Sequence, residues 1–287
     1  RVSITQQRAI AIALQQRITA PDASVIAIHN AFVDYCLLML VVATAHRASN
    51  TPFWFARDLR LDDRLVFVCD KIVVGSEARF VPLPDTVVTM LRYYQRHLVA
   101  VRRRIGGSQT SIVRHIDGLL FSTSRGNAAI AARQEADDPE CGYFFKVSPG
   151  GKVTPVNTRA LEMSIRGIMG APTAKDFRAA IADALWGMGV SGSDVSTFLG
   201  HAGDLHPFGP ASVCSVQGWA DRLRPIIAEY LEERGWSPIT SPLLEKVDSS
   251  QNVRYGLPNF DSGLASYEGR NRETQLAKAR VRKIAIQ

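Results

Sequence analysis

Apolar residues recur every three or four positions along most of the chain, which is the spacing of amphipathic helices. We expect helices over residues 3–17, 24–45, 85–104, 158–169, 175–188, 191–199 and 215–233. Residues that favour helix ends punctuate these segments: Pro21 and Asp22 break the first, and Gly189 and Gly200 close two later ones. Asn157 or Thr158 can cap the helix that begins there.

The pattern changes between residues 64 and 84, where β-branched and aromatic residues cluster in 65–69 and 71–74. Gly75 and Ser76 turn the chain, and residues 77–84 complete a small antiparallel sheet. Residues 123–152 contain scattered Gly, Asp, Pro and Ser and are interpreted as a loop. The sequence therefore predicts a mainly α fold with a small antiparallel β-sheet inserted early.

Composition places the chain among globular proteins, since 46% of its residues are hydrophobic and 8% are aromatic. The longest unbroken apolar run is ten residues, Cys36–Ala45, which is about half of what a bilayer requires. We therefore expect no membrane partner. The formal net charge of +7 favours an anionic partner such as nucleic acid, although only weakly. The tail from about residue 247 is polar and basic.

The four cysteines are far apart and form no CxxC pair. Neither a zinc site nor a disulfide framework is expected, and a reducing cytosol is the simpler interpretation.

Five basic residues stand out as candidates for phosphate chemistry: Arg47, Lys71, Lys175, Arg178 and His201. Two arginines can hold the non-bridging oxygens of one phosphate by bidentate hydrogen bonds. A lysine can protonate a leaving oxygen, and a histidine can donate to the phosphate or carry a proton. Such a set would stabilise phosphoryl transfer without a metal. Each residue taken alone also has a structural interpretation, such as capping a helix end or lying on a solvated face.

The chain resembles the catalytic domain of the tyrosine recombinase (phage integrase) family over roughly residues 24–233. The motifs are Ala45-His-Arg-Ala-Ser49, Lys71 ahead of Arg79-Phe-Val-Pro-Leu-Pro84, Lys175-Asp-Phe-Arg178 and Phe198-Leu-Gly-His201. The family has Arg, Lys, His/Lys-x-x-Arg, His/Trp and Tyr in this order. Arg47 and Lys71 are 24 residues apart, and Arg178 and His201 are 23 apart, both typical of the family.

The resemblance implies site-specific DNA recombination or integration, through a covalent protein–DNA intermediate and with no metal or other cofactor. Arg47 and Arg178 would clamp the phosphate, Lys71 would be the general acid, and Lys175 and His201 would assist. The helix of residues 158–169 would lie against double-stranded DNA through Arg159 and Arg166. The family works as a homo-tetramer on DNA, which here implies the cytoplasm and the bacterial nucleoid.

The resemblance also suggests a division of the chain. Residues 1–23 would be a linker or the end of a preceding DNA-binding domain, and residues 24–246 the recombinase-like domain. Residues 247–287 would form a basic tail that contacts DNA or a neighbouring subunit.

Two departures from the family pattern affect the expected chemistry. Asn50 stands where the family often has an acidic residue. The nucleophilic tyrosine, expected about nine or ten residues after His201, is missing, and Pro210 or Ala211 occupies its position. Three explanations stay open: deliberate replacement, a natural relative that binds DNA without cutting it, or a substitute nucleophile. The candidate substitutes are Ser212, Cys214, Tyr230, Tyr255 and Tyr267.

Two other functions are compatible with the sequence. One is a non-catalytic DNA-binding protein derived from a recombinase, which keeps the phosphate pocket and lacks the nucleophile. The other is a helical interaction module whose basic residues never converge.

Overall fold

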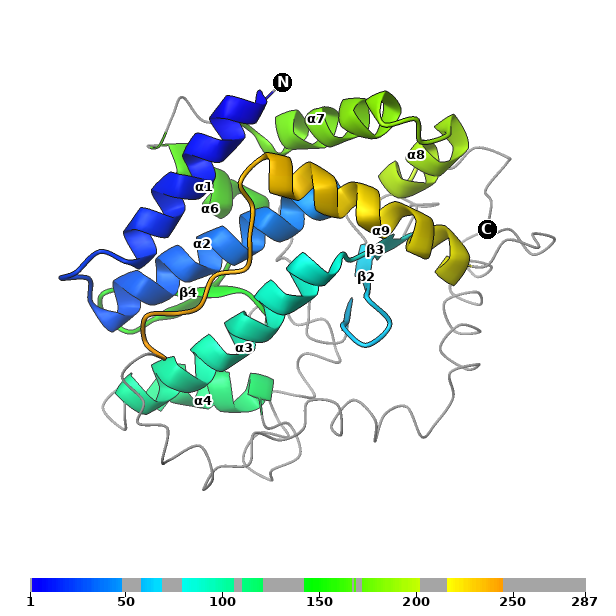
Figure 1. Ribbon diagram of the computed structural model, residues 1–287. Helices are drawn as coiled ribbons and strands as arrows, with labels where there is room; N and C mark the ends of the chain where they lie inside the picture. Colours follow the sequence, from blue (N-terminus) through cyan, green and yellow to red (C-terminus); the bar gives the residue numbers. More distant parts are fainter. Residues whose placement is uncertain are drawn as a thin grey trace, which may run out of the picture.

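The computed structural model describes residues 2–47, 58–68, 79–105, 110–120, 142–166, 168, 172–201 and 216–244. The helices in these parts are α1 (Ile4–Ile18), α2 (Val25–Thr44), α3 (Asp85–Ile105), α4 (Thr110–Leu120), α6 (Thr158–Arg166), α7 (Ala174–Gly187), α8 (Gly192–Leu199) and α9 (Val216–Glu233) (Figure 1). The strands are β1 (Leu59–Arg60), β2 (Leu65–Val68), β3 (Arg79–Pro82), β4 (Phe145–Val147) and β5 (Val153–Pro155). The expected class, mainly α with a small antiparallel sheet, is confirmed.

Side-chain caps fix where several helices begin. Ser3, Ser24, Thr173 and Ser191 each accept a hydrogen bond from the backbone N–H three residues later. The first backbone N–H groups of a helix have no partner within it, so such a cap stabilises the helix by about 1 kcal/mol. The side chain of Asn157 accepts from the N–H of Ala160 in the same way, as expected at the start of α6.

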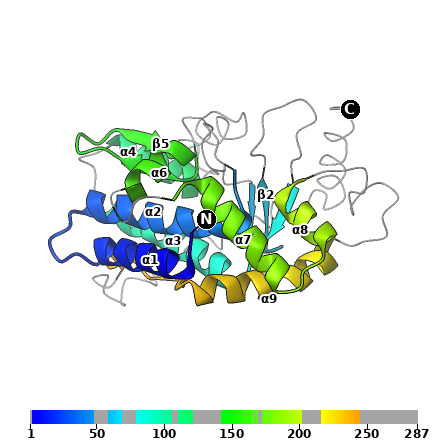
Figure 2. The same cartoon turned by 90° about the horizontal axis from the view of Figure 1, so that it is seen from above.

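Helix α2 is the centre of the fold. It contacts α1, α3, α6, α7, α9 and β4, and the two views in Figures 1 and 2 show these elements around it. Phe32, Leu37 and Leu40 on this helix are fully buried, and each buried side chain of this size contributes about 1.5–3 kcal/mol.

Within the described part of the chain, α2 is also the helix with the length and composition of a membrane span. Most of it is buried by the other elements, and the core helix of a soluble protein satisfies the same test, so this is weak evidence for a membrane.

Helix α1 lies in the segment that we expected to be a linker or the end of a preceding DNA-binding domain, and it packs into the same core as α2. Ile10, Leu14 and Ile18 are buried. The amide nitrogen of Gln7 donates to the hydroxyl of Tyr230 on α9 at 3.1 Å. Residues near the start of the described chain are therefore held against residues near its end.

One sheet lies close to its predicted position, and the other was not predicted. Strands β1, β2 and β3 form an antiparallel sheet, with Val66 opposite Val81, close to the expected position. The expected strand 71–74 lies outside the described residues, as does the tail from residue 247. The interpretation of residues 123–152 as a loop is wrong at β4, which pairs with β5.

Tertiary contacts explain why β4 was missed. Its three residues are too few for a recognisable alternation, and Asn30 of α2 makes the strand regular. The Asn30 amide donates to the carbonyl of Val147 at 2.8 Å and accepts from its N–H at 2.9 Å. Helix α4 was not predicted either. Its Asp117 forms an ion pair with Arg102, which holds α4 against α3.

A chain of buried hydrogen bonds joins α2, α3 and the segment after α9. His29 Nε2 lies 3.1 Å from the carbonyl of Phe145, and this ring nitrogen must therefore donate. In a neutral ring its Nδ1 then accepts from His97 Nε2 at 3.1 Å. Ser241 donates in turn to His97 Nδ1 at 2.7 Å. The arrangement requires both rings to be neutral.

Burial lowers the pKa of His29 from 6.5 to about 4, and it lowers the pKa of His97 well below its usual range. The nearby charges of His115 and Lys146 lower the pKa of His29 further.

We expect the free energy of unfolding to fall as the pH drops from about 6.5 to 4. In this range the unfolded chain binds a proton at His29 that the folded protein excludes, so the loss at pH 4 is about 3 kcal/mol from this residue. Urea denaturation at several pH values in this range measures the slope of the free energy of unfolding against pH. His29→Gln should flatten the slope, because the proton excluded by the folded protein is then missing from the unfolded chain as well. An undiminished slope in His29→Gln would show that these rings are not the cause.

Candidate functional site

Two helices end side by side in the same local structure. Helix α2 ends in Ala45 and α8 ends in Gly200, both in the left-handed conformation, with φ of 50° and 64°. The next N–H in each case bonds five residues back, from His46 to Val41 and from His201 to Ser196. The last carbonyls of a helix have no partner within it and carry partial negative charge. The contacts described below bring both sets of carbonyls to one place.

Arg178 on α7 connects the two helix ends. One terminal nitrogen of its guanidinium donates to the carbonyl of Ala45, and the other donates to the carbonyl of Leu199. The second of these nitrogens also lies 3.3 Å from Nε2 of His201. Arg47, which follows the cap of α2, donates to the carbonyl of Gly200 at 3.4 Å.

The structure thus brings together three of the five candidates, Arg47, Arg178 and His201, which we call the basic cluster. Arg47 and Arg178 are half-buried, and His201 is exposed. The side chains are therefore at the surface, where a ligand can reach them.

A third arginine lies beneath the basic cluster and was missed as a functional candidate. Arg79 opens strand β3 and is 5% exposed. Its Nε donates to the carbonyl of Phe198 at 2.9 Å. One terminal nitrogen lies 3.4 Å from the carbonyls of Thr44 and Ala45. The signal in the sequence is an arginine at the start of an apolar strand, where a charged side chain needs buried partners.

The remaining candidates are placed as follows. Lys175 is exposed on α7, one turn before Arg178 and on the same face. Arg159 and Arg166 are exposed on α6. Lys71, Pro210 and Ala211 lie outside the described residues.

The basic run at the end of α3 is at least partly structural. Arg102 pairs with Asp117, and Arg104 donates to the carbonyl of Leu243 at 3.4 Å.

The tyrosines in the described part of the chain do not offer a nucleophile from the core. Tyr230 is buried, its hydroxyl accepts from Gln7, and burial raises its pKa, so the suggestion that it replaces the missing tyrosine is wrong. Tyr35, Tyr94 and Tyr143 are also buried, while Tyr93 is partly exposed. The other suggested substitutes, Ser212, Cys214, Tyr255 and Tyr267, lie outside the described residues.

The basic cluster carries groups that suit an anionic ligand. Arg47 and Arg178 bring two guanidinium groups to the ends of two helices, and both are half-buried at the surface. Each terminal nitrogen of a guanidinium carries two N–H groups. Guanidinium groups of this kind bind phosphate through paired N–H donors.

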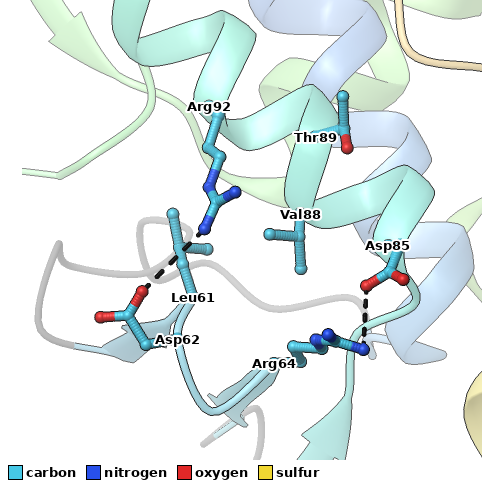
Figure 3. Close-up of a pocket in the computed structure, with 7 residues that line it drawn as sticks. All are labelled: Leu61, Asp62, Arg64, Asp85, Val88, Thr89 and Arg92. Atoms are coloured by element: carbon cyan, nitrogen blue, oxygen red, sulfur yellow. Dashed lines mark ion pairs between the residues drawn. The ribbon is translucent and has the colours of Figure 1, made fainter. Parts of the chain in front are cut away.

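A hollow of about 490 Å³ elsewhere on the surface does not share this character (Figure 3). It is lined by Leu61, Asp62, Arg64, Asp85, Val88, Thr89 and Arg92. Its charges are already paired, with 3.2 Å between Arg64 and Asp85 and 4.0 Å between Arg92 and Asp62. We therefore base the functional argument on the basic cluster.

Among the residues whose positions the structure gives, no group of three or more His, Cys, Asp or Glu side chains is arranged to hold a metal ion.

Comparison of the chain with protein-family models, with curated proteins and with solved structures finds no match.

We expect Gly200→Ala to destabilise the protein more than Gly189→Ala. Both glycines have positive φ, so both variants carry a strain of about 1 kcal/mol or somewhat more. A Cβ at position 200 would lie 2.9 Å from Cδ of Arg79, whereas one at position 189 meets nothing within 4 Å. Urea denaturation of the two variants measures the difference. Equal losses would show that Arg79 does not pack tightly under Gly200.

Proposed function

We propose that this protein is a tyrosine-recombinase-like DNA-binding protein that holds a backbone phosphate of double-stranded DNA in the basic cluster. The observation that carries the proposal is the meeting of Arg47, Arg178 and His201. These residues are far apart in sequence, follow the family's order, and come together at two helix ends. The fold proposed for residues 24–246 is the catalytic-domain fold of that family.

The proposed reaction is phosphodiester transesterification. A hydroxyl or thiol of the protein gives its proton to a base, for which His201 is the candidate, and attacks the phosphorus. A bond to the 3′ phosphate forms, the bond to the 5′ oxygen breaks, and that oxygen takes up a proton. Arg47 and Arg178 neutralise the charge on the non-bridging oxygens. Lys71 protonates the leaving oxygen, with assistance from Lys175 and His201. The second strand's 5′ hydroxyl reverses the step and completes recombination within a homo-tetramer on DNA in the bacterial nucleoid.

A second candidate function is DNA binding without cleavage. It is favoured by the absence of any tyrosine between Tyr143 and Tyr230 and by the burial of the latter. The phosphate contacts are the same in both functions, so binding and cleavage need separate tests.

We expect Arg47→Ala and Arg178→Ala each to weaken binding to a random-sequence DNA duplex by about five- to tenfold at low salt. Each should also reduce the slope of log K against log salt concentration by about one, because one phosphate contact is lost. Fluorescence anisotropy over a salt series measures both quantities.

Arg92→Ala is the matched control for this experiment. It removes an exposed arginine from the hollow of Figure 3 and should change affinity and slope little. Equal effects of all three variants would show that binding depends on net charge and not on the basic cluster.

We expect the chain as it stands to bind a pool of singly nicked duplexes without forming a covalent adduct. Ala211→Tyr or Pro210→Tyr should then produce an adduct that survives SDS electrophoresis, because the nucleophile returns to the expected position. The adduct should disappear when Arg178→Ala is added, which is the control for specificity. An adduct from the unchanged chain would indicate a substitute nucleophile, and no adduct from any variant would favour binding alone.

A further inference from the structure

We propose that Arg79 is a positioning residue, which sets the geometry of the basic cluster without touching the DNA. This inference rests on the proposed function, because the cluster is taken to bind a backbone phosphate. Arg79 is 5% exposed and lies beneath the two helix ends, so its side chain is shielded from a ligand at the surface.

The first argument is that Arg79 connects the ends of two different helices. Its Nε bonds to Phe198 in the last turn of α8, and its Nη2 contacts Thr44 and Ala45 at the end of α2. Both ends carry partial negative charge, so their close approach is unfavourable unless a cation lies between them. A buried guanidinium supplies that charge and also donates to carbonyls that lack helical partners.

The second argument is that Arg79 and Arg178 share an acceptor. Both donate to the carbonyl of Ala45, and their partners on α8, Phe198 and Leu199, are neighbours in the chain. A shift of either helix end on loss of Arg79 would therefore move the carbonyls that orient Arg178. Arg47 and His201 follow the same two caps and would move with them.

The third argument comes from the backbone at the two caps. Ala45 adopts a positive φ of 50°, which costs a residue with a Cβ about 1 kcal/mol or more and persists only where the surroundings impose it. The two arginines at its carbonyl provide that constraint. At the other cap, a Cβ on Gly200 would lie 3.1 Å from Nη1 of Arg79, so glycine permits the close approach of the guanidinium.

The geometry also explains why lysine would not replace Arg79. The guanidinium is a rigid fork whose donors reach both helix ends simultaneously, whereas an ammonium is a single point on a flexible stem. Arg79→Lys keeps the positive charge, but it should no longer hold the ends of α2 and α8 in their native relative position. It therefore separates positioning from simple charge.

The test is a double-mutant cycle between Arg79→Lys and Arg178→Ala, with affinity for a random-sequence duplex as the readout. We expect Arg79→Lys to weaken binding about fivefold alone and less than about twofold in the Arg178→Ala background, because its effect passes through the basic cluster. As a control, Arg92→Ala takes the place of Arg79→Lys in the cycle. Its effect on affinity should simply add to that of Arg178→Ala. Urea denaturation confirms that each variant is folded under the binding conditions.

A second readout reports on the basic cluster without DNA. The ring signals of His201 in a ¹H–¹³C NMR spectrum should shift in Arg79→Lys and stay in place in Arg92→Ala. If Arg79→Lys does not fold, Gly200→Ala serves as the second variant. Its Cβ would lie 2.9 Å from Cδ of Arg79 and would therefore force the Arg79 side chain to move.

The two proposals fail in different ways. If Arg178→Ala leaves DNA binding unchanged, the proposed function fails and this inference fails with it. If Arg178→Ala weakens binding but Arg79→Lys does not, or if the two effects are additive, only the role of Arg79 is overturned. Unchanged His201 signals in a folded Arg79 variant would overturn it as well.

Discussion

The site depends on how two helix ends of like partial charge are held together. Helices α2 and α8 both direct their last carbonyls to one place, and the guanidinium groups of Arg79 and Arg178 occupy the space between them. The positive charge removes the repulsion, and the planar forks fix the distance between the helices. Arg47 and His201 directly follow the two helix caps. Their positions are consequently set by helices α2 and α8 and not by loops alone.

The structural role of these arginines is compatible with the proposed function. Arg47 donates to a helix-end carbonyl, as a capping residue does, and it is also half-exposed beside Arg178 and His201. A guanidinium already oriented by main-chain carbonyls loses less conformational entropy when it binds a phosphate. Such pre-orientation is what a binding site for a backbone phosphate requires.

The sequence predicts those features whose cause is local. The starts of α1, α2 and α8 follow from the caps Ser3, Ser24 and Ser191, and each side chain bonds within three residues of itself. The resemblance led us to expect Arg47, Arg178 and His201 in one place, and hydrogen bonds at the two helix ends bring these three together. Other features with distant partners have no such motif behind them, and they were missed. Strand β4 is completed by Asn30, 117 residues away, and Arg79 bonds to a carbonyl 119 residues away, so no periodicity in the sequence reveals either.

The contacts between the two ends of the described chain have a consequence for biosynthesis. Gln7 bonds to Tyr230, Tyr35 to Ser237, and His97 to Ser241, over separations of 223, 202 and 144 residues. During translation, the apolar surface of α2 lacks these covering elements until almost the whole domain has left the ribosome. Such late closure slows folding and leaves apolar surface exposed to water until the last contacts form.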